Sequence, residues 1–422
     1  MEYQINTDFL KFNPKPPIIM HIDLNSCFAT IEQQANRHLR GKPIAVAAYN
    51  SPGGCILAPS IESKALGRKT GMKVKDGKIL CPDLIVLEPD PWKYRNVHLK
   101  LRNLLKKYTN DVVPKSIDEF VLNFEGYPSF EKGMFYTGRQ IKQEIKEKIG
   151  EWLTVSVGIA PNRFLAKTAS GLNKPDGLDE ININNFKNIF ASLKLPDLCG
   201  IASNNTVRLN NVGIYTVLDF YNASLAKLKS AFASICGYHW YLRLRGWEVD
   251  DVEFERKSFG NSFALPKPLT EMEDLAPILH KLVQKTNKRM RLAGFKCQGV
   301  HVSVLYRDGT HWHIGRKTQI PLFYWGDIYK KAYKMLIKSP YKKPVHTLAV
   351  SCFNLSDKDV VQNNLFDEVE KKKNLANALD YINEKWGDFV ITPAKMLSTQ
   401  NVVIDRISFG GVKELIGQGG IE

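Results

Sequence analysis

Residues 18–32 read IIMHIDLNSCFATIE and carry the strongest structural signal in this chain. Apolar residues dominate positions 18–22 without strict alternation, and this pattern predicts a buried central strand. Asp23 ends the run, and the residues that follow predict the start of a helix. A carboxylate at the end of a buried strand is costly unless an opposite charge compensates it, and divalent cations are the usual compensation.

Two further acids follow downstream in the tetrapeptide Ser-Ile-Asp-Glu at 116–119. Apolar runs on both sides of it predict a turn or hairpin edge between short strands. If Asp23, Asp118 and Glu119 converge, they make a hard-oxygen site for two Mg²⁺ ions, with Mn²⁺ as a substitute. Such ions clamp the attacking and leaving oxygens of phosphoryl transfer. The alternative is that Asp118 and Glu119 are ordinary surface acids, which are common at turns.

Four sequence blocks together resemble one enzyme family. The first runs from Asp23 to Glu32 and includes the aromatic Phe28, and the second is the tetrapeptide 116–119. The third spans 156–167, and the fourth is Lys-Pro-Asp-Gly at 174–177. Their residues and order resemble the bacterial Y-family (translesion) DNA polymerases, in particular the polymerase IV and polymerase V branches. Looser resemblance continues through the rest of the chain.

This resemblance implies a multidomain α+β fold shaped like a right hand. The expected parts are a palm with a split βαβ core (1–34 and 89–180), fingers (35–88), a helical thumb (181–250), a linker (251–256), an α/β little finger (257–355) and a C-terminal tail (356–422). It also implies a template-directed DNA polymerase that adds dNTPs to a primer 3′ end in DNA damage tolerance. Asp23, Asp118 and the main-chain carbonyl of Leu24 would hold the nucleotide-side metal ion. Glu119 would complete the second metal site with Asp23 and Asp118.

The nucleotide contacts also follow from the resemblance. Phe28 stands at the steric-gate position, where a flat ring under the sugar excludes a 2′-hydroxyl, although its alternative role is core packing. Cys27 lies beside it at a nucleotide-contact position. Lys174 and Lys64 would reach the triphosphate as point charges.

This chain departs from the family pattern at three positions near the triphosphate. Ile61 and Ala58 replace a tyrosine and a hydroxyl residue that contact the triphosphate in many members, so Ser60 is the candidate substitute donor. Asn25 replaces an aspartate, and we expect it to act through its backbone.

The charge of the chain favours a polyanionic partner. Its formal net charge is +16, which would equally suit a membrane surface. Residues 257–355 alone hold 17 Lys and Arg against 5 Asp and Glu. Within them, Lys257, Ser258, Arg316 and Lys317 are candidate contacts to primer-template DNA. The alternative is a solvated basic face.

The helical stretch 181–250 contains a degraded helix-hairpin-helix signature. Gly200 and Gly213 lie in its two turns, and Ala202 stands where a second hairpin glycine is usual. Helix N-terminal amides at such a motif bind a DNA phosphate. The alternative is a helical bundle that packs only on itself.

The tail contains a peptide that resembles the clamp-binding motif of bacterial polymerases, with Gln362, Leu365 and Phe366 as its anchors. A bacterial sliding clamp is therefore an expected partner, together with SOS accessory proteins. The alternative is the start of an amphipathic helix, and residues 375–386 predict a helix that Gly387 ends.

The composition of the chain indicates its compartment and the state of its cysteines. No apolar run has transmembrane length and no signal pattern is visible, so we expect a monomeric cytoplasmic protein associated with the nucleoid. Seven scattered cysteines predict reduced thiols. His311 and His313 are expected to alternate on a strand of a basic hairpin, not to bind metal.

The rival functions are a non-catalytic Y-family adaptor bound to the sliding clamp, or another two-metal enzyme such as a nuclease. Retention of all three carboxylates argues against the first, and Phe28 with Lys174 argues against the second.

Overall fold

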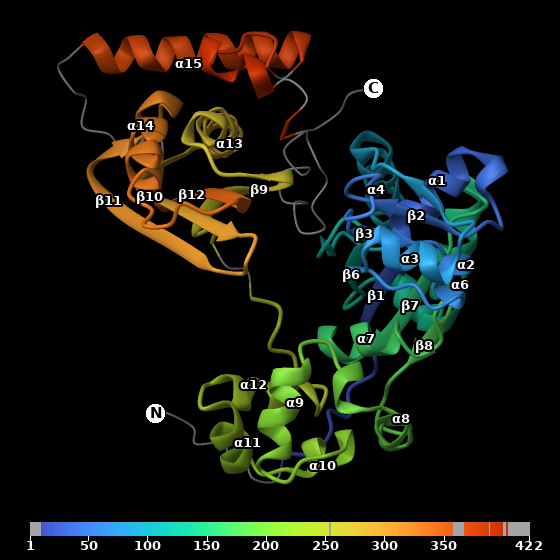
Figure 1. The fold of residues 1–422 in the computed structure, drawn as a ribbon. Coiled ribbons are helices and arrows are strands. Elements are labelled where there is room, and N and C mark those ends of the chain that lie inside the picture. The colour runs from blue at the N-terminus through green and yellow to red at the C-terminus, as the bar shows by residue number, and fades with distance from the viewer. Residues whose placement is uncertain (1–9, 253–254, 358–366, 388, 400–401, 404–422) are drawn as a thin grey trace. The chain divides into compact units, whose positions relative to one another are not determined.

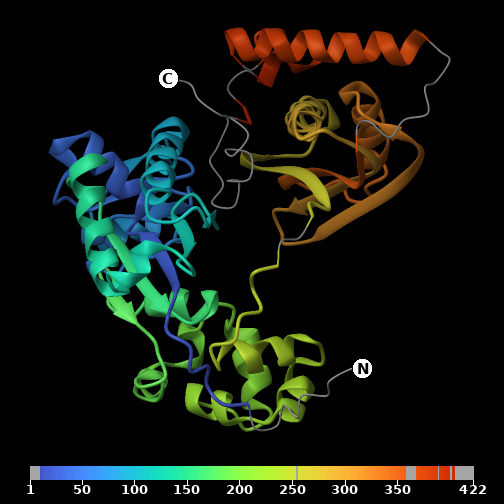
Figure 2. The ribbon, with the colours of Figure 1, turned by 180° about the vertical axis from the view of Figure 1, so that it is seen from behind.

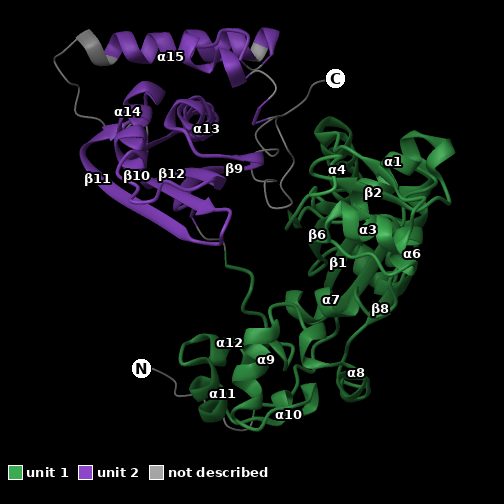
Figure 3. Ribbon diagram, in the orientation of Figure 1, with its two compact units in different colours: residues 1–253, 406–422 green, residues 254–405 purple. Residues whose placement is uncertain are grey.

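The computed structural model describes residues 10–252, 255–357, 367–387, 389–399 and 402–403 (Figure 1). Two compact units account for the chain, residues 1–253 with 406–422 (unit 1) and residues 254–405 (unit 2), as Figure 3 shows by colour. The division between them falls inside the stretch 251–256 that the sequence suggested as a linker. Among the described residues, no helix has both the length and the apolar character needed to cross a bilayer.

Unit 1 is built around a five-stranded sheet with the strand order β5-β6-β1-β7-β8. The central strand β1 pairs antiparallel with both β6 and β7, and β8 runs parallel to β7. The bounds of the strands are β1 Ile19–Leu24, β5 Val112–Pro114, β6 Glu119–Asn123, β7 Val155–Ala160 and β8 Leu178–Glu180.

Both faces of this sheet are buried, which explains why β1 and β7 are apolar without alternation. Met20, Ile22 and Leu24 of β1 belong to the core cluster beneath one layer of helices. Ile19 belongs to a second cluster that continues into α7 and the helices after it. The first layer comprises α1 Cys27–Ala35, α4 Pro91–Leu105, α5 Pro128–Glu131 and α6 Met134–Lys148; α7 is Arg163–Ala169.

A smaller three-stranded sheet, with the order β3-β2-β4, lies in the stretch 35–88. The strands β2 and β3 are almost fully buried, whereas β4 is half-buried, and one face of β2 packs against a small separate core. The elements are η2 Arg37–Leu39, β2 Ile44–Ala47, β3 Ile56–Pro59, α2 Ile61–Ala65, α3 Val74–Leu80 and β4 Ile85–Leu87.

The last part of unit 1 is helical, as its sequence predicts. Aromatic residues fill its core, with Trp240 in contact with Phe164, Phe220 and Phe232. The helices are α8 Phe186–Ser192, η3 Leu195–Asp197, α9 Ser203–Asn210, α10 Val217–Asn222, α11 Leu225–Phe232 and α12 Cys236–Arg243.

Unit 2 is a four-stranded antiparallel sheet with the order β11-β10-β12-β9. Helices α13 and α14 lie on the same face of this sheet (Figures 1 and 2). The sequence indicated β/α/β/β patterning here; the structure adds α14 before the last strand, because an apolar stripe runs through its lysine-rich sequence. The elements are β9 Ser258–Leu269, α13 Met272–Leu292, β10 Phe295–Tyr306, β11 His311–Leu322, α14 Trp325–Leu336, β12 Val345–Asp357, α15 Asp367–Trp386 and η4 Ala394–Thr399.

The tail helix α15 begins earlier than the predicted residue 375 and ends where predicted, before Gly387 at φ 103°. Arg291 of α13 forms an ion pair with Asp380 of α15 at 2.6 Å, and Lys372 of α15 pairs with Asp327 of α14 at 3.1 Å. The helix therefore belongs to unit 2 by specific contacts.

Candidate active site

The pairing of β1 with β6 brings the predicted carboxylates together. Asp23 lies directly opposite Glu119 in the antiparallel register. Asp118 precedes β6, and its carbonyl oxygen accepts a hydrogen bond from the amide of Leu24 at 2.9 Å. The register alone therefore places three acids and the Leu24 main chain at one end of the sheet.

Two lysines compensate two of these acids. The Lys174 ammonium lies 2.5 Å from Asp23 Oδ2. The Lys167 ammonium lies 2.8 Å from both Glu119 oxygens and comes from α7, which packs on β7 and β1. Each side chain of these pairs is at least partly exposed, so ligands can replace the lysines without opening the core.

Asp118 has no such ion pair among the described residues, and the Ser116 hydroxyl donates to it at 2.5 Å. Burial, together with the charges of Asp23 and Glu119, raises the pKa of Asp118 to about 6, although the hydrogen bond from Ser116 acts in the opposite direction. The oxygen donors of this cluster are those that Mg²⁺ and Mn²⁺ prefer.

Phe28 lies at the start of α1, immediately after this end of β1. Its ring is fully buried and stacks on Tyr94 of α4, with centroids 4.4 Å apart. The Tyr94 hydroxyl donates to Glu32 at 2.9 Å, and Lys93 pairs with the same carboxylate at 2.8 Å. The stack on Tyr94 therefore holds the Phe28 ring in one orientation.

The other predicted nucleotide contacts differ in their surroundings. Lys64 is close enough to the acids for Asp23 and Asp118 to influence its pKa, which burial and the charge of Lys174 lower. Cys27 is buried, and burial raises the pKa of its thiol.

The hydroxyl of Ser60, the candidate triphosphate donor, has hydrogen-bond partners within the protein. Its hydroxyl is fully buried and accepts from the amides of Ile44 and Ser63, each at 3.2 Å. It also donates to the carbonyl of Lys42 at 3.4 Å. These bonds make Ser60 the N-cap of α2 and favour a structural role.

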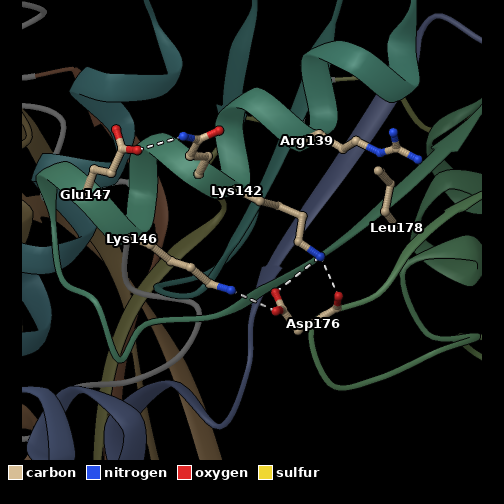
Figure 4. Close-up of a pocket in the computed structure, with 7 residues that line it drawn as sticks. Arg139, Lys142, Lys146, Glu147, Asp176 and Leu178 are labelled. Carbon is tan, nitrogen blue, oxygen red and sulfur yellow. Dashed lines mark hydrogen bonds and ion pairs between the residues drawn. The ribbon is translucent and has the colours of Figure 1, made fainter.

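The loop that carries Lys174 is fixed from two sides. On one side, the Asn25 side chain accepts from the amide of Asp176 at 2.8 Å and donates to Ser156 at 2.9 Å. Asn25 thus acts through its side chain as well, contrary to the expectation of a backbone role alone. On the other side, Lys142 and Lys146 of α6 both reach Asp176, at 3.2 and 2.9 Å (Figure 4). These contacts line an open pocket of about 510 Å³ on the outer side of the loop.

Comparison with known proteins agrees with this geometry. Residues 22–171 match the impB/mucB/samB family, and residues 256–365 match the C-terminal domain of the same family. DNA polymerase IV of Pelotomaculum thermopropionicum is 30% identical over 396 residues, which cover 92% of this chain and 98% of that protein. DNA polymerase IV 1 of Bacillus subtilis is 30% identical over 407 residues, covering 94% and 97%.

A solved Y-family DNA polymerase chimera of Dbh and Dpo4 has the same fold, with a TM-score of 0.70 and 26% identity. The match covers 80% of this chain and 98% of the chimera. The chain belongs to the Y-family of DNA-directed DNA polymerases. A post-insertion binary complex of the Dbh DNA polymerase is also similar, with a TM-score of 0.56 and 25% identity.

The candidate DNA contacts of this Y-family polymerase lie outside the acidic site. Gly200 precedes α9 and Gly213 follows it, both at positive φ that favours glycine. Lys257 and Ser258 stand exposed at the start of β9, and Arg316 and Lys317 are exposed on the edge strand β11. The predicted clamp-binding residues, Gln362, Leu365 and Phe366, lie outside the described residues.

Sequence reasoning missed several residues of the polymerase site. Lys167 ends the third motif, and the motif itself gives it no role. His21 reads as one more residue of a buried strand, although it lies within reach of Asp23 and Glu119. Burial, followed by the charges of Lys167 and Lys174, lowers the pKa of His21 to about 3. The signal available in the sequence was the two-residue spacing of His21 and Asp23, which puts both on one face of a strand.

Proposed function

We propose that this polymerase performs template-directed DNA synthesis of the translesion type, adding dNTPs to a primer 3′ end by two-metal phosphoryl transfer in DNA damage tolerance. The observation that carries the proposal is the convergence of Asp23, Asp118 and Glu119, with Lys174 and Lys64 close by. Carboxylates beside lysines suit metal ions and a triphosphate together, and membership of the Y-family supplies the reaction class.

Asp23, Asp118 and the Leu24 carbonyl would hold the ion on the nucleotide side, and Glu119 would hold the second ion with Asp23 and Asp118. Bound ions of this kind lower the pKa of the primer hydroxyl and neutralise charge on the transferring phosphate. Mg²⁺ is the expected ion, with Mn²⁺ as a substitute, because the donors are mainly carboxylate oxygens.

The lysines act as exchangeable counter-charges in this proposal. While the acids are without a ligand, Lys174 neutralises Asp23 and Lys167 neutralises Glu119. A nucleotide gives Lys174 a triphosphate partner, since the ammonium is a flexible point charge that redirects without rebuilding its loop. Asn25, Lys142 and Lys146 keep that loop in place throughout.

Phe28 would exclude ribonucleotides. Because Tyr94 stacks on the ring and Glu32 fixes Tyr94, the ring of Phe28 cannot retreat to admit a 2′-hydroxyl. The family pattern of palm, fingers, thumb and little finger is proposed for residues 1–34 with 89–180, 35–88, 181–250 and 257–355.

DNA would be held by positively charged surface and by helix termini. The turns at Gly200 and Gly213 offer main-chain amides to phosphates, while Arg316 and Lys317 offer side-chain charge. We also propose that Gln362, Leu365 and Phe366 bind a bacterial sliding clamp, that the protein works on chromosomal DNA in the cytoplasm, and that SOS accessory proteins assist it.

Primer extension tests the proposal. Wild type and Glu119→Ala are compared on a primed template with Mg²⁺ and either dNTPs or rNTPs. We expect extension with dNTPs only, and loss of extension in the variant. Folded wild type that binds DNA without extending it would contradict the proposal and favour the adaptor function, for which clamp binding is then measured.

A further inference from the structure

The loop between α7 and β8 carries Lys174 and has an unusual backbone conformation. Asp176, which follows Lys174 closely in the chain, has a φ of 60°. This is the left-handed region, which is unfavourable for a residue with a Cβ atom and persists where surrounding contacts fix it. The direction in which the Lys174 side chain leaves the loop therefore depends on the contacts that hold Asp176.

Lys142 of α6 binds this loop from its outer side. Its ammonium donates to the main-chain carbonyls of Asp176 and Gly177, the latter at 3.1 Å. It also forms an ion pair with the Asp176 carboxylate at 3.2 Å (Figure 4). An ammonium has three N–H donors, so these three acceptors use all of them. The Lys142 side chain is only 15% exposed, which is uncommon for a lysine.

The neighbouring cations of α6 hold the loop less closely. Lys146 contacts the carboxylate of Asp176 and no main-chain atom of the loop in the described structure, and its side chain is 41% exposed. Arg139 is exposed and points toward Leu178, without an ion pair to Asp176 among the described residues (Figure 4). Of these three cations, Lys142 is therefore the one that fixes the main chain of the loop.

On its inner side, the loop faces the candidate active site. The Asn25 side chain, which follows β1, accepts from the amide of Asp176 at 2.8 Å. The Lys174 ammonium lies 2.5 Å from Asp23 at the end of the same strand. Lys142 thus reaches the active site through the loop, from the side opposite to the nucleotide-binding lysine.

We propose that Lys142 is a positioning residue, which fixes the direction of Lys174 toward the triphosphate of the incoming nucleotide. The inference rests on the proposed function in that Lys174 contacts the triphosphate. An ammonium on a flexible stem binds a phosphate more tightly when its main chain is already in place, since less freedom is lost on binding. Removal of Lys142 leaves the carbonyls of residues 176 and 177 to water and lets residue 176 leave the left-handed region.

The expected effect falls on nucleotide binding. Lys142→Gln replaces the ammonium with a shorter, uncharged side chain that cannot reproduce the three contacts. We expect about tenfold weaker dNTP binding, below the roughly 100-fold loss that a full 1 Å misplacement of a reacting group brings.

Equilibrium binding of a dNTP to the full chain on primer-template DNA measures the effect. The primer lacks its 3′-hydroxyl, so no reaction follows binding. Wild type, Lys142→Gln, Lys174→Ala and the double variant form a double-mutant cycle. If Lys142 acts through Lys174, Lys142→Gln weakens binding in wild type and has no further effect in Lys174→Ala. A loss of equal size in both backgrounds, or no loss in a folded Lys142→Gln protein, overturns the proposal.

Hydrogen exchange gives a second readout that needs no nucleotide. Lys142→Gln should speed amide exchange in residues 173–178 and leave β1 unchanged, whereas unchanged exchange in the loop contradicts the proposal. The matched control Arg139→Gln removes the same charge from the same helix and should change neither exchange nor binding. Equal losses of dNTP binding in the two variants would assign the effect to charge and overturn the proposal. Thermal melting establishes the fold of each variant.

The cycle separates this inference from the proposed function. If Lys174→Ala itself leaves dNTP binding unchanged, the proposed triphosphate contact fails, and this inference fails with it. If Lys174→Ala weakens binding while Lys142→Gln does not, the triphosphate contact stands and only the positioning role of Lys142 is removed.

Discussion

The sheet of unit 1 is covered on both faces, whereas the sheet of unit 2 is covered by helices on one. In β1 and β7 almost every residue is buried. In β10 burial alternates, with Val300, Val302 and Val304 facing the helices and His301 and Ser303 on the other face. The central strands of unit 1 are thus shielded from water on both faces, whereas β10 of unit 2 is more exposed on one face.

This difference decides where charge can be placed. In unit 1, the acids of the candidate site lie at strand ends, and lysines or a neighbouring hydroxyl compensate them in a poorly solvated site. In unit 2, most of the excess positive charge is exposed, where water screens it and a polyanion can reach it. Chemistry should therefore depend on single residues of unit 1, and DNA affinity on many residues of unit 2.

The largest expected effect is the loss of synthesis when one site acid of unit 1 is neutralised. Asp118→Asn should lower the rate of dNTP addition on the order of 1000-fold, because a metal ligand stabilises the transition state by several kcal/mol. Single-turnover primer extension with Mg²⁺ measures it. The control Asp83→Asn removes an exposed acid and should leave the rate unchanged. Equal rates in all three proteins would break the contrast between the units.

The next effect concerns the sugar gate. Phe28→Ala should raise the efficiency of rNTP addition relative to dNTP addition roughly 100-fold, because removal of the ring leaves space for a 2′-hydroxyl. Competition between dNTP and rNTP on one template gives the ratio. Phe124→Ala is the control, since Phe124 is equally buried but belongs only to the core. If both variants change the ratio alike, loosening of the core and not the gate is responsible.

The pH dependence of the free energy of unfolding tests whether Asp118 is poorly solvated in the folded protein. The pKa of Asp118 is raised to about 6, so the unfolded chain releases this proton at lower pH than the folded chain. The free-energy cost of ionising Asp118 in the folded protein is absent below the pKa of the unfolded chain. This cost grows as the pH rises and is fully present above about pH 6. Metal-free Asp118→Asn should therefore be about 3 kcal/mol more stable than wild type at pH 8. Denaturant unfolding at pH 8 and pH 4 measures the difference, which should vanish at pH 4; a destabilised variant at pH 8 would show that Asp118 is compensated.

The smallest effect is expected on the open sheet of unit 2. Replacing Arg316 and Lys317 with glutamine should weaken DNA binding to a similar degree for all sequences and reduce the salt slope by about 2. Fluorescence anisotropy at several salt concentrations gives both values. The control replaces Lys330 and Lys331, two exposed lysines of α14, and removes the same charge from the helical layer. Identical losses in both double variants would mean that net charge, and not the sheet edge, holds DNA.

The sequence by itself identified Asp23, Asp118 and Glu119, the gate candidate Phe28 and the triphosphate candidate Lys174 through motifs that resemble those of the Y-family. It also gave the order of the helical and β-rich regions through local patterns, since burial on two faces makes a strand uniformly apolar. The same local logic located the tail helix and its end at Gly387.

Only the tertiary structure decided which ion-pair and hydrogen-bond partners the site residues have. The Lys167–Glu119 pair, the Asn25–Asp176 hydrogen bond and the closeness of His21 to Glu119 all join segments far apart in the chain. The capping role of Ser60 likewise depends on the neighbouring strand β2. The physical reason is that strand register and helix packing, which are set by the whole core, fix these distances to within a hydrogen bond, whereas a local pattern fixes only the face on which a side chain lies.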